Sequence, residues 1–365
     1  MNSVYGVRST GKLVAEAGRA LIREGHDVTA AYGREAKPDG VVPLMRIGTD
    51  LDARVHAVMS RLFDAHGLWS RRATRRFLRQ VEALAPELIW LHNIHGYYLN
   101  YEMLFAWLRR HPEIRVRWTL HDCWAFTGHC AYFTMAKCEK WRDACGGCPQ
   151  LKTYPRTIGL DGSRRNLRRK QRAFAGVRDL TLITPSRWLA DLTRESFLRE
   201  YPVEVVHNEV DKTVFRPTPS DVRGRYGLGD RRVVLGVAVG WEETKGLPDM
   251  LRLRAALDER YVVVLVGVTD AQRRRLPAGV VGIGRTADQR ELAAIYTAAD
   301  VFVNPTHQDN YPTVNLEAAA CGTVVITYQV GGSPESALPE NVVPEGDIDA
   351  LAARVRAVCG EISGA

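Results

Sequence analysis

The amino-acid sequence predicts an α/β protein made of two domains, each built on a parallel sheet. Short apolar runs rich in β-branched residues alternate with helical patterns along the chain, which favours parallel strands joined by helices. The strand candidates are too many for one sheet, so two sheets are the better division. Residues 207–221 carry two prolines and no periodicity, as is typical of a linker. We therefore predict domains over residues 1–208 and 209–365.

The strand candidates end in polar residues. In order, they are residues 88–94, 116–122, 180–186, 203–209, 233–240, 261–268, 300–306 and 323–332. The clearest helical patterns between them cover residues 104–111, 290–299 and 314–322. Ligands of open parallel sheets lie beyond the carboxyl ends of the strands. The polar residues expected at those ends are His92-Asn93, His121-Asp122, Ser186, Trp241 to Lys245, and the segment after Asn304.

The composition is that of a soluble globular protein, with 365 residues, 45% hydrophobic and 25% charged. No apolar run reaches the roughly 18–20 residues of a membrane span. The first residues lack the basic and then apolar pattern of a signal peptide. We therefore expect a cytoplasmic location. The charge is uneven, because residues 1–208 carry 33 Lys and Arg against 21 Asp and Glu, whereas residues 209–365 carry 17 against 21.

The excess of basic residues lies mainly in two runs, residues 71–80 and 164–172. One helical face of the first run carries Arg72, Arg75, Arg76 and Arg79. Such a face is either solvated or rests on anionic lipid or an acidic acceptor, where each basic residue contributes roughly 1 kcal/mol. The second interpretation predicts peripheral contact with the inner face of a membrane. Nucleic acid is not expected as a partner, since the runs lack interleaved aromatic residues.

Residues 6–13, GVRSTGKL, nearly match a phosphate-binding Walker A loop. A Walker A loop follows a complete strand and ends in Ser or Thr, whose hydroxyl holds magnesium. Here the last position is Leu13 and only five residues precede Gly6, so an NTPase loop is not predicted. We expect instead a loop from Gly6 to Gly11 that opens an amphipathic helix. Free backbone N–H groups at such a helix start can bind an anion or a hydroxyl-rich ligand.

Residues 307–327, HQDNYPTVNLEAAACGTVVIT, carry the strongest functional signal. Pro312 and Thr313 open a helix after a polar loop, with Thr313 as the expected N-cap. Asp309 and Glu317 stand eight residues apart and are expected to point toward one ligand. Two carboxylates suit a polyhydroxylated ligand, and the helix N-terminus suits a diphosphate. The alternative is a capped core helix with exposed acids.

The pattern D-x7-E followed by AAACGTVVIT resembles the E-x7-E signature of glycosyltransferase family 4, retaining nucleotide-sugar transferases with the GT-B fold. Segments along the chain resemble the colanic-acid and exopolysaccharide branch of this family. They are RSTGK, LHNIHGYYLN, TLHDCWAFTGHCAYF, ITPSRWL, WEETKGL and DNYPTVNLEAAACG. The resemblance covers nearly the whole chain. It implies two Rossmann-like domains whose parallel sheets face an interdomain cleft. Asp309 departs from the signature, being one methylene shorter than Glu.

Carried over residue by residue, the resemblance implies a donor site for a nucleotide diphosphate-sugar, UDP- or GDP-linked first, without a catalytic metal. Lys245 would neutralise the diphosphate as it leaves, because negative charge develops there. Asp309 would hold the sugar ring, and Glu317 would bind the ribose or the sugar hydroxyls. Further donor contacts are implied for Gly6, Gly11, Gly284, Arg285, Asn310, Tyr311, Thr313 and Val314.

In the first domain, His121 matches the family histidine that faces the donor sugar, and the neighbouring Asp122 would fix its tautomer. A structural histidine is the alternative. The resemblance implies an acceptor side lined by Ser9, Thr10, His92, Asn93, His95 and Tyr97. The acceptor would be a hydroxyl of a saccharide, a lipid-linked sugar or a small metabolite.

Five of the seven cysteines lie in residues 123–150, which we interpret as an insertion in the first domain. Cys130, Cys138, Cys145 and Cys148 form the pattern C-x7-C-x6-C-x2-C, whose last pair has zinc-knuckle spacing. A structural zinc on these four thiolates is one interpretation. Disulfides and free thiols packed with aromatic residues are the alternatives, and the expected cytoplasmic location counts against disulfides.

The combined pattern predicts a glycosyltransferase that moves a sugar from a nucleotide diphosphate-sugar to a hydroxyl with retention of configuration. Two other classes remain open. A nucleotide-sugar epimerase of the same fold would convert the donor without an acceptor. A non-catalytic nucleotide-sugar-binding protein would show no turnover with any donor.

Overall fold

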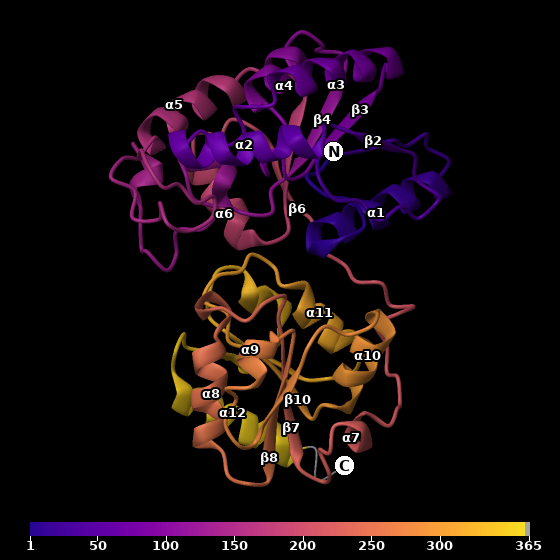
Figure 1. Cartoon of the computed structure of the whole chain (residues 1–365), viewed down its shortest axis with the longest axis vertical. Coiled ribbons are helices and arrows are strands. Elements are labelled where there is room, and N and C mark those ends of the chain that lie inside the picture. Colours follow the sequence, from indigo (N-terminus) through magenta and orange to yellow (C-terminus); the bar gives the residue numbers. More distant parts are fainter. Residues whose placement is uncertain (362–365) are drawn as a thin grey trace. The chain divides into compact units, whose positions relative to one another are not determined.

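The computed structural model describes residues 1–361 and contains two compact units. The first unit runs from Met1 to His207, and the second begins at Asn208, one residue before the start predicted from the sequence. Every strand pairing in the described residues is parallel, so the predicted α/β class is confirmed (Figure 1). None of the helices within residues 1–361 combines the length and apolar character needed to cross a membrane.

The first unit is organised around a four-stranded sheet in the order β3-β4-β5-β6. The strands are β3 (Leu88–Leu91), β4 (Arg115–Thr119), β5 (Leu180–Thr184) and β6 (Val203–Val205). The helices that accompany them are α2 (Asp50–Phe63), α3 (Arg71–Leu84), α4 (Tyr101–Leu108), α5 (Ser163–Phe174) and α6 (Arg187–Glu195). Two 3₁₀ turns, η1 (Cys123–Phe126) and η2 (Lys140–Arg142), lie in the cysteine-rich segment. Large aromatic side chains fill the core, and the rings of Trp118 and Phe174 meet edge to face.

The start of the chain adds a small parallel sheet to this unit. It comprises α1 (Arg8–Arg23), β1 (Ala30–Tyr32) and β2 (Leu44–Arg46). Residues 1–5 connect this sheet to β3, because Asn2 bridges to Tyr32 and the Met1 ammonium donates to the Trp90 carbonyl oxygen at 2.7 Å.

The predicted loop from Gly6 to Gly11 is shorter in the structure. Helix α1 begins at Arg8, so Ser9, Thr10 and Gly11 form its first turn. Gly6 makes the bend before it with φ of 65°, and the Lys37 carbonyl oxygen lies 2.6 Å from the point that a Cβ would occupy. Only glycine combines this backbone conformation with so close an approach.

The second unit is a doubly wound sheet in the order β12-β11-β10-β7-β8-β9. Its strands are β7 (Arg232–Val237), β8 (Tyr261–Val266), β9 (Val280–Ile283), β10 (Val301–Asn304), β11 (Val325–Tyr328) and β12 (Val342–Val343). Its helices are α7 (Val222–Arg225), α8 (Leu247–Ala256), α9 (Asp270–Arg273), α10 (Gln289–Ala298), α11 (Thr313–Ala320) and α12 (Ile348–Glu361). Three 3₁₀ turns are η3 (Glu243–Lys245), η4 (Ser333–Ser336) and η5 (Pro339–Asn341).

Apolar clusters cover both faces of this sheet. One cluster packs α8 and α12 against it, and the other packs α7, α10 and α11 against it (Figure 1). Strand β8 reads YVVVLV and is buried along its whole length, as expected of an inner parallel strand with helices on both faces.

The eight strand candidates correspond to β3, β4, β5, β6, β7, β8, β10 and β11. The eight candidates leave out β1, β2, β9 and β12. Strands β1, β2 and β12 are two or three residues long and too short to show a period, and the apolar run of the four-residue β9 is interrupted by Gly282.

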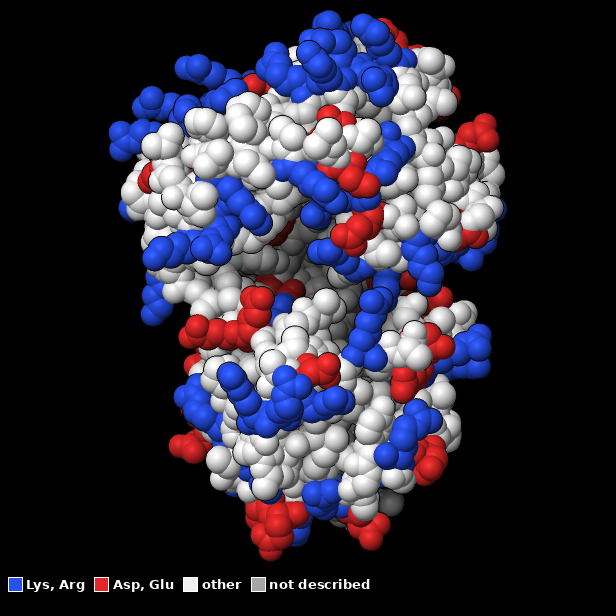
Figure 2. All heavy atoms as spheres, viewed as in Figure 1, with Lys and Arg blue, Asp and Glu red and all other residues white. Residues whose placement is uncertain are grey.

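Basic side chains gather on the surface of the first unit (Figure 2). The arginines at positions 72, 75, 76 and 79 of α3 are all exposed, as predicted. The second basic run is not wholly solvated, because Lys170 of α5 is buried. Its ammonium donates to the carbonyl oxygens of Trp124 and Thr127 and lies 3.5 Å from the centroid of the Trp124 ring. Burial lowers the pKa of Lys170 to about 7.

Candidate functional site

The strand order of the second unit places a topological switch point between β7 and β10. The chain runs from β7 toward β8 and β9 on one side, and from β10 toward β11 and β12 on the other. Loops diverge at the carboxyl ends of two such neighbouring strands, and this is where doubly wound sheets bind ligands. The turn η3 follows β7, and the segment that leads into α11 follows β10. Both predicted donor motifs therefore lie at the switch point.

Lys245 and Asp309 meet directly at this edge. The Nζ atom of Lys245 lies 2.8 Å from Oδ2 of Asp309, and their side chains are 37% and 21% exposed. The other carboxylate oxygen, Oδ1, accepts a hydrogen bond from the backbone N–H of Asn310 at 2.9 Å. Both side chains therefore remain accessible to solvent. A ligand could replace Asp309 as the partner of the Lys245 ammonium with a phosphate, and Lys245 as the partner of the Asp309 carboxylate with a hydroxyl.

Two features fix the backbone around this pair. The Thr244 carbonyl oxygen accepts hydrogen bonds from the His307 backbone N–H at 2.9 Å and from the Thr306 hydroxyl at 3.2 Å. Gly246 has φ of 74°, and the Pro305 carbonyl oxygen lies 2.1 Å from the position of a Cβ there. The loops after β7 and β10 therefore touch through their backbones, which sets the reach of Lys245 toward Asp309.

The start of α11 differs from the prediction in one respect. Pro312, not Thr313, is the N-cap, and no described side chain caps the first turn. Thr313 is already helical because the proline before it has the extended backbone of a cap. Asn310 and Tyr311, which follow Asp309 in the sequence, are buried. Thr313 and Val314, in the first turn of α11, are half-buried.

Glu317 lies one turn into α11 and has a buried neighbour. Its Oε2 atom accepts a hydrogen bond from the hydroxyl of Tyr296, in α10, at 3.0 Å. Burial, reinforced by the Glu317 carboxylate, raises the pKa of Tyr296 well above its ordinary value. The tyrosine therefore stays a donor and holds one carboxylate oxygen in place.

Gly284 and Arg285 follow β9, which is the edge strand of the sheet. The backbone N–H of Gly267, after β8, donates to the Gly284 carbonyl oxygen at 3.2 Å. Gly284 is half-buried and Arg285 is exposed. The donor contact implied for these two residues remains a prediction.

In the first unit, His92 and His121 follow the neighbouring strands β3 and β4 and pack together. The Nδ1 atom of His92 lies 3.1 Å from Nε2 of His121, with the rings stacked at 5.3 Å. Burial lowers the pKa of His121 to about 4 and that of His92 well below its ordinary value. Both imidazoles are therefore neutral near pH 7, and one of the two facing nitrogens carries the shared proton.

Asp122 contacts a different histidine from the one expected. Its Oδ2 atom lies 3.2 Å from Nε2 of His95, and the Nδ1 atom of His95 is 3.0 Å from the Tyr154 hydroxyl. The structure thus shows two pairs, His92 with His121 and Asp122 with His95, and the effect of Asp122 on the tautomer of His121 remains a prediction. The strand neighbours decide this arrangement, because β3 and β4 end side by side.

One small pocket collects several of the predicted acceptor residues. It is lined by His92, Asn93, His95, His121 and Asp122, together with Trp118, Trp124 and four adjoining residues. Ser9, Thr10 and Tyr97 do not line this pocket. Ser9 and Thr10 stand in the first turn of α1, and Tyr97 packs its ring against His66 at 4.7 Å.

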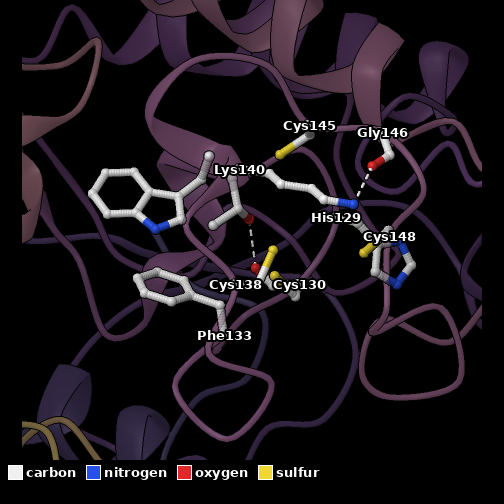
Figure 3. Close-up of a pocket in the computed structure, with 10 residues that line it drawn as sticks. His129, Cys130, Phe133, Cys138, Lys140, Cys145, Gly146 and Cys148 are labelled. Atoms are coloured by element: carbon white, nitrogen blue, oxygen red, sulfur yellow. Dashed lines mark hydrogen bonds between the residues drawn. The ribbon is translucent and has the colours of Figure 1, made fainter.

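The four cysteines of the predicted zinc site line a single pocket (Figure 3). Within residues 1–361, no three His, Cys, Asp or Glu side chains stand in an arrangement that would hold a metal ion. All seven cysteines are free thiols. The geometry therefore gives the zinc prediction no support.

Sequence patterns missed the residues that hold the site residues in place. They include Tyr296, which contacts Glu317, and Tyr154, which contacts His95. They also include the pair of His307 and Asp249, whose Nε2 and Oδ2 atoms are 3.1 Å apart. Tyr296 and Tyr154 come from other elements, and no local spacing connects them to Glu317 or His95, whereas His307 lies two residues before Asp309. Asp122 was recognised from the sequence because it directly follows His121.

Two Rossmann-like units of this kind make up the GT-B fold, and solved structures with that fold match nearly the whole chain. Sucrose-phosphate synthase from Thermosynechococcus elongatus superposes with a TM-score of 0.71 at 19% identity, covering 99% of this chain and 87% of that one. Anabaena HepE, solved in complex with UDP-glucose, gives a TM-score of 0.62 at 14% identity and covers 99% and 90%. At these identities the likeness establishes the fold.

The family follows from the sequence comparison. Residues 10–214 match the model of Glycosyltransferase Family 4, and residues 231–361 match that of Glycosyl transferases group 1. The chain therefore belongs to glycosyltransferase family 4.

A curated relative, the putative colanic acid biosynthesis glycosyl transferase WcaC of Escherichia coli K12, is 26% identical over 248 residues, or 66% of this chain. The matched region makes up 59% of that relative's own length, and from 33% to 54% of seven other curated relatives.

Proposed function

We propose that this protein transfers a sugar from a nucleotide diphosphate-sugar to a hydroxyl acceptor with retention of configuration. The observation that carries the proposal is the contact between Lys245 and Asp309 at the switch point of the second unit, next to the uncapped start of α11. A cation, a carboxylate and a helix start without a side-chain cap at one sheet edge suit a ligand that joins a diphosphate to a sugar. The UDP-glucose bound by HepE makes uracil the first base to test.

Donor binding would exchange the internal ion pair for contacts with the ligand. The ammonium of Lys245 moves to the diphosphate, where it offsets the charge that develops as the phosphate leaves. Asp309, released from Lys245, accepts a hydrogen bond from a sugar hydroxyl. Glu317 keeps one oxygen on Tyr296 and offers the other to the ribose or the sugar.

The acceptor would bind in the first unit, in the pocket lined by His92, Asn93, His95 and His121. The neutral imidazole of His121 suits a hydrogen bond to a sugar hydroxyl. In the transfer, the bond from the anomeric carbon to the phosphate oxygen breaks as the acceptor oxygen bonds to the same face of that carbon. The acceptor proton passes to the departing phosphate, so no covalent intermediate on the protein is required. Colanic acid synthesis by the relative from Escherichia coli makes a saccharide the first acceptor class to test.

The first experiment is thermal unfolding of the full chain with UDP, GDP, ADP, CMP and dTDP, each at about 1 mM. A ligand at 100 times its Kd adds roughly 2.7 kcal/mol to stability, which gives a measurable rise in Tm. We expect one nucleoside diphosphate to stabilise wild type and Lys212→Ala, which alters an exposed lysine of the same unit, but not Lys245→Ala.

The matching sugar nucleotides are then incubated with and without saccharide acceptors. Transfer that requires an acceptor and keeps the anomeric configuration fits the proposal. Conversion of the donor without an acceptor would identify an epimerase instead. Binding without any turnover would identify a non-catalytic nucleotide-sugar-binding protein.

A further inference from the structure

The two segments that meet in the pair of Lys245 and Asp309 are joined a second time, by Asp249 and His307. Asp249 stands in the first turn of α8, four residues after Lys245. His307 stands two residues before Asp309. The Nε2 atom of His307 lies 3.1 Å from Oδ2 of Asp249. Each segment therefore supplies one carboxylate and one nitrogen donor, and both contacts join the same two segments.

The second contact is less exposed than the first. The side chains of His307 and Asp249 are 17% and 2% exposed. Those of Lys245 and Asp309 are 37% and 21% exposed. A ligand that enters from solvent therefore reaches the pair of Lys245 and Asp309, whereas the carboxylate of Asp249 is almost wholly shielded from it.

Asp249 offers His307 a fixed acceptor. The hydroxyl of Tyr328, at the end of β11, donates to Oδ2 of Asp249 at 2.8 Å. The guanidinium of Arg252, one turn further along α8, donates to Oδ1. Hydrogen bonds to both oxygens offset the cost of burying this carboxylate. Because Asp249 belongs to a helix packed on the sheet, its position does not depend on the loop that carries His307.

The ring of His307 has a carboxylate at each nitrogen. Its Nδ1 atom lies 2.6 Å from Oε1 of Glu345, which follows β12, and its Nε2 atom faces Asp249. A carboxylate accepts hydrogen bonds and does not donate them, so the ring donates to one of the two, or to both when it carries two protons. The ring also packs against that of Tyr328, with 5.7 Å between the centroids. Contacts with α8, β11 and the segment after β12 therefore hold His307 in place.

The backbone carries this constraint to Asp309. The His307 N–H donates to the Thr244 carbonyl oxygen at 2.9 Å, and the Asp309 carbonyl oxygen accepts the N–H of Gly332 at 3.4 Å. Only Gln308 separates the histidine from the aspartate. Two residues of extended chain span at most about 7 Å, so a fixed ring at position 307 limits where the Asp309 carboxylate can lie.

We propose that His307 is a positioning residue that keeps the two donor-site segments together when a ligand separates Lys245 from Asp309. A phosphate that binds the ammonium of Lys245 removes one of the two side-chain contacts between the segments. The contact of His307 with Asp249 remains, and the Asp309 carboxylate stays within reach of the same ligand. The identity of that ligand rests on the proposed function, whereas the holding of the segment does not.

Hydrogen exchange tests the holding of the segment without any nucleotide. The full chain and its variants are exchanged in deuterated water, and peptides that cover residues 304–312 are followed by mass spectrometry. We expect His307→Ala to raise the exchange rate of this segment roughly tenfold, the factor typical of one hydrogen bond to a charged group. His307→Gln, whose amide can still donate to Asp249, should raise it less. The control His26→Ala alters an exposed histidine of the first unit and should leave it unchanged.

Calorimetric titration with UDP tests the consequence for binding. We expect the Kd for UDP to rise roughly tenfold in His307→Ala, less in His307→Gln, and not at all in His26→Ala. The Tm of each variant is measured alongside without nucleotide. A purely structural role would lower the Tm of His307→Ala and leave its Kd for UDP like that of wild type.

Two results would overturn the inference: unchanged exchange of residues 304–312 in His307→Ala, or an unchanged Kd in that variant when wild type binds UDP. Failure of wild type to bind any nucleoside diphosphate would count against the proposed function instead, and the exchange rates would then decide whether His307 holds the segment. If His307→Ala does not fold, His307→Asn, with a side chain one methylene shorter than that of Gln, is compared with His307→Gln by the same two criteria.

Discussion

Lys245 and Asp309 join the two loops that diverge at the switch point of the second unit, with 2.8 Å between Nζ and Oδ2. The two residues are 64 positions apart in the sequence and meet because β7 and β10 are neighbours in the sheet. Each charge has the other as its partner. Under the proposed function, a ligand with both phosphate and hydroxyl groups would replace what each residue gives up.

Replacing Lys245 should abolish most transfer without unfolding the protein. We expect Lys245→Ala to lower kcat/KM by roughly 10²–10³, because it removes a charge that stabilises the leaving group. Its effect on the free energy of unfolding should stay within about 1 kcal/mol, since the ion pair is partly exposed to solvent. Steady-state kinetics and urea unfolding measure the two quantities, with Lys212→Ala as the control. Activity like that of wild type in Lys245→Ala would remove this residue from the site.

The contact of Gly246 with Pro305 can be tested by a matched pair of glycine variants. Gly246 and Gly240 both have positive φ, 74° and 86°, but only Gly246 has a backbone oxygen where the new methyl group would lie. We expect Gly246→Ala to lower the free energy of unfolding by about 1–3 kcal/mol more than Gly240→Ala. Urea unfolding of both variants measures the difference. Equal losses in the free energy of unfolding would show that the loops after β7 and β10 move apart at no cost in free energy.

Tyr296 should act as a positioning residue for Glu317. Tyr296→Phe removes the hydroxyl that donates to Glu317 while keeping the buried ring, so nucleotide affinity should fall by roughly tenfold or less. Glu317→Ala should cause a larger loss of turnover, because the carboxylate itself is removed. Calorimetric titration with UDP distinguishes the two variants. An unchanged Kd in Tyr296→Phe would mean that Glu317 is held in place by other contacts.

The buried histidines predict how stability depends on pH. Burial lowers the pKa of His121 to about 4, whereas an unfolded histidine titrates near 6.5, so the unfolded chain binds more protons between these values. Stability should therefore be complete above about pH 6.5 and should decline as the pH falls toward 4, by up to about 3 kcal/mol for this residue. Urea unfolding at pH 7.5, 6 and 5 measures the decline. His121→Asn should show a shallower decline, and an unchanged slope would contradict the assignment.

The exposed arginine face of α3 gives a test of membrane contact. If this face rests on anionic lipid, the chain should sediment with vesicles that contain phosphatidylserine and not with neutral ones. The double variant Arg75→Glu and Arg76→Glu should bind less, because it reverses charge on an exposed surface. Sedimentation at two salt concentrations measures the effect. Equal recovery with neutral and anionic vesicles would leave the face simply solvated.

Much of the fold followed from sequence patterns because most strands show their apolar character locally, whereas the short strands β1, β2 and β12 and the glycine-interrupted β9 do not. The candidate donor residues also followed, since Lys245 and Asp309 stand in recognisable motifs directly after strands. Their contact with each other could not be predicted, because it depends on strand order. The pairing of His92 with His121 depends in the same way on the neighbouring positions of β3 and β4. Proline geometry at position 312 decided the cap of α11, where residue preference alone favoured Thr313.

The buried amine of Lys170 has a practical consequence. Its contacts with Trp124 and Thr127 connect α5 to the segment after β4, and solvent does not reach it in the folded chain. A water-soluble acylating reagent should therefore label the exposed lysines quickly and Lys170 only after the first unit opens. The labelling rate at this one position would then report the opening of that unit, independently of events in the second.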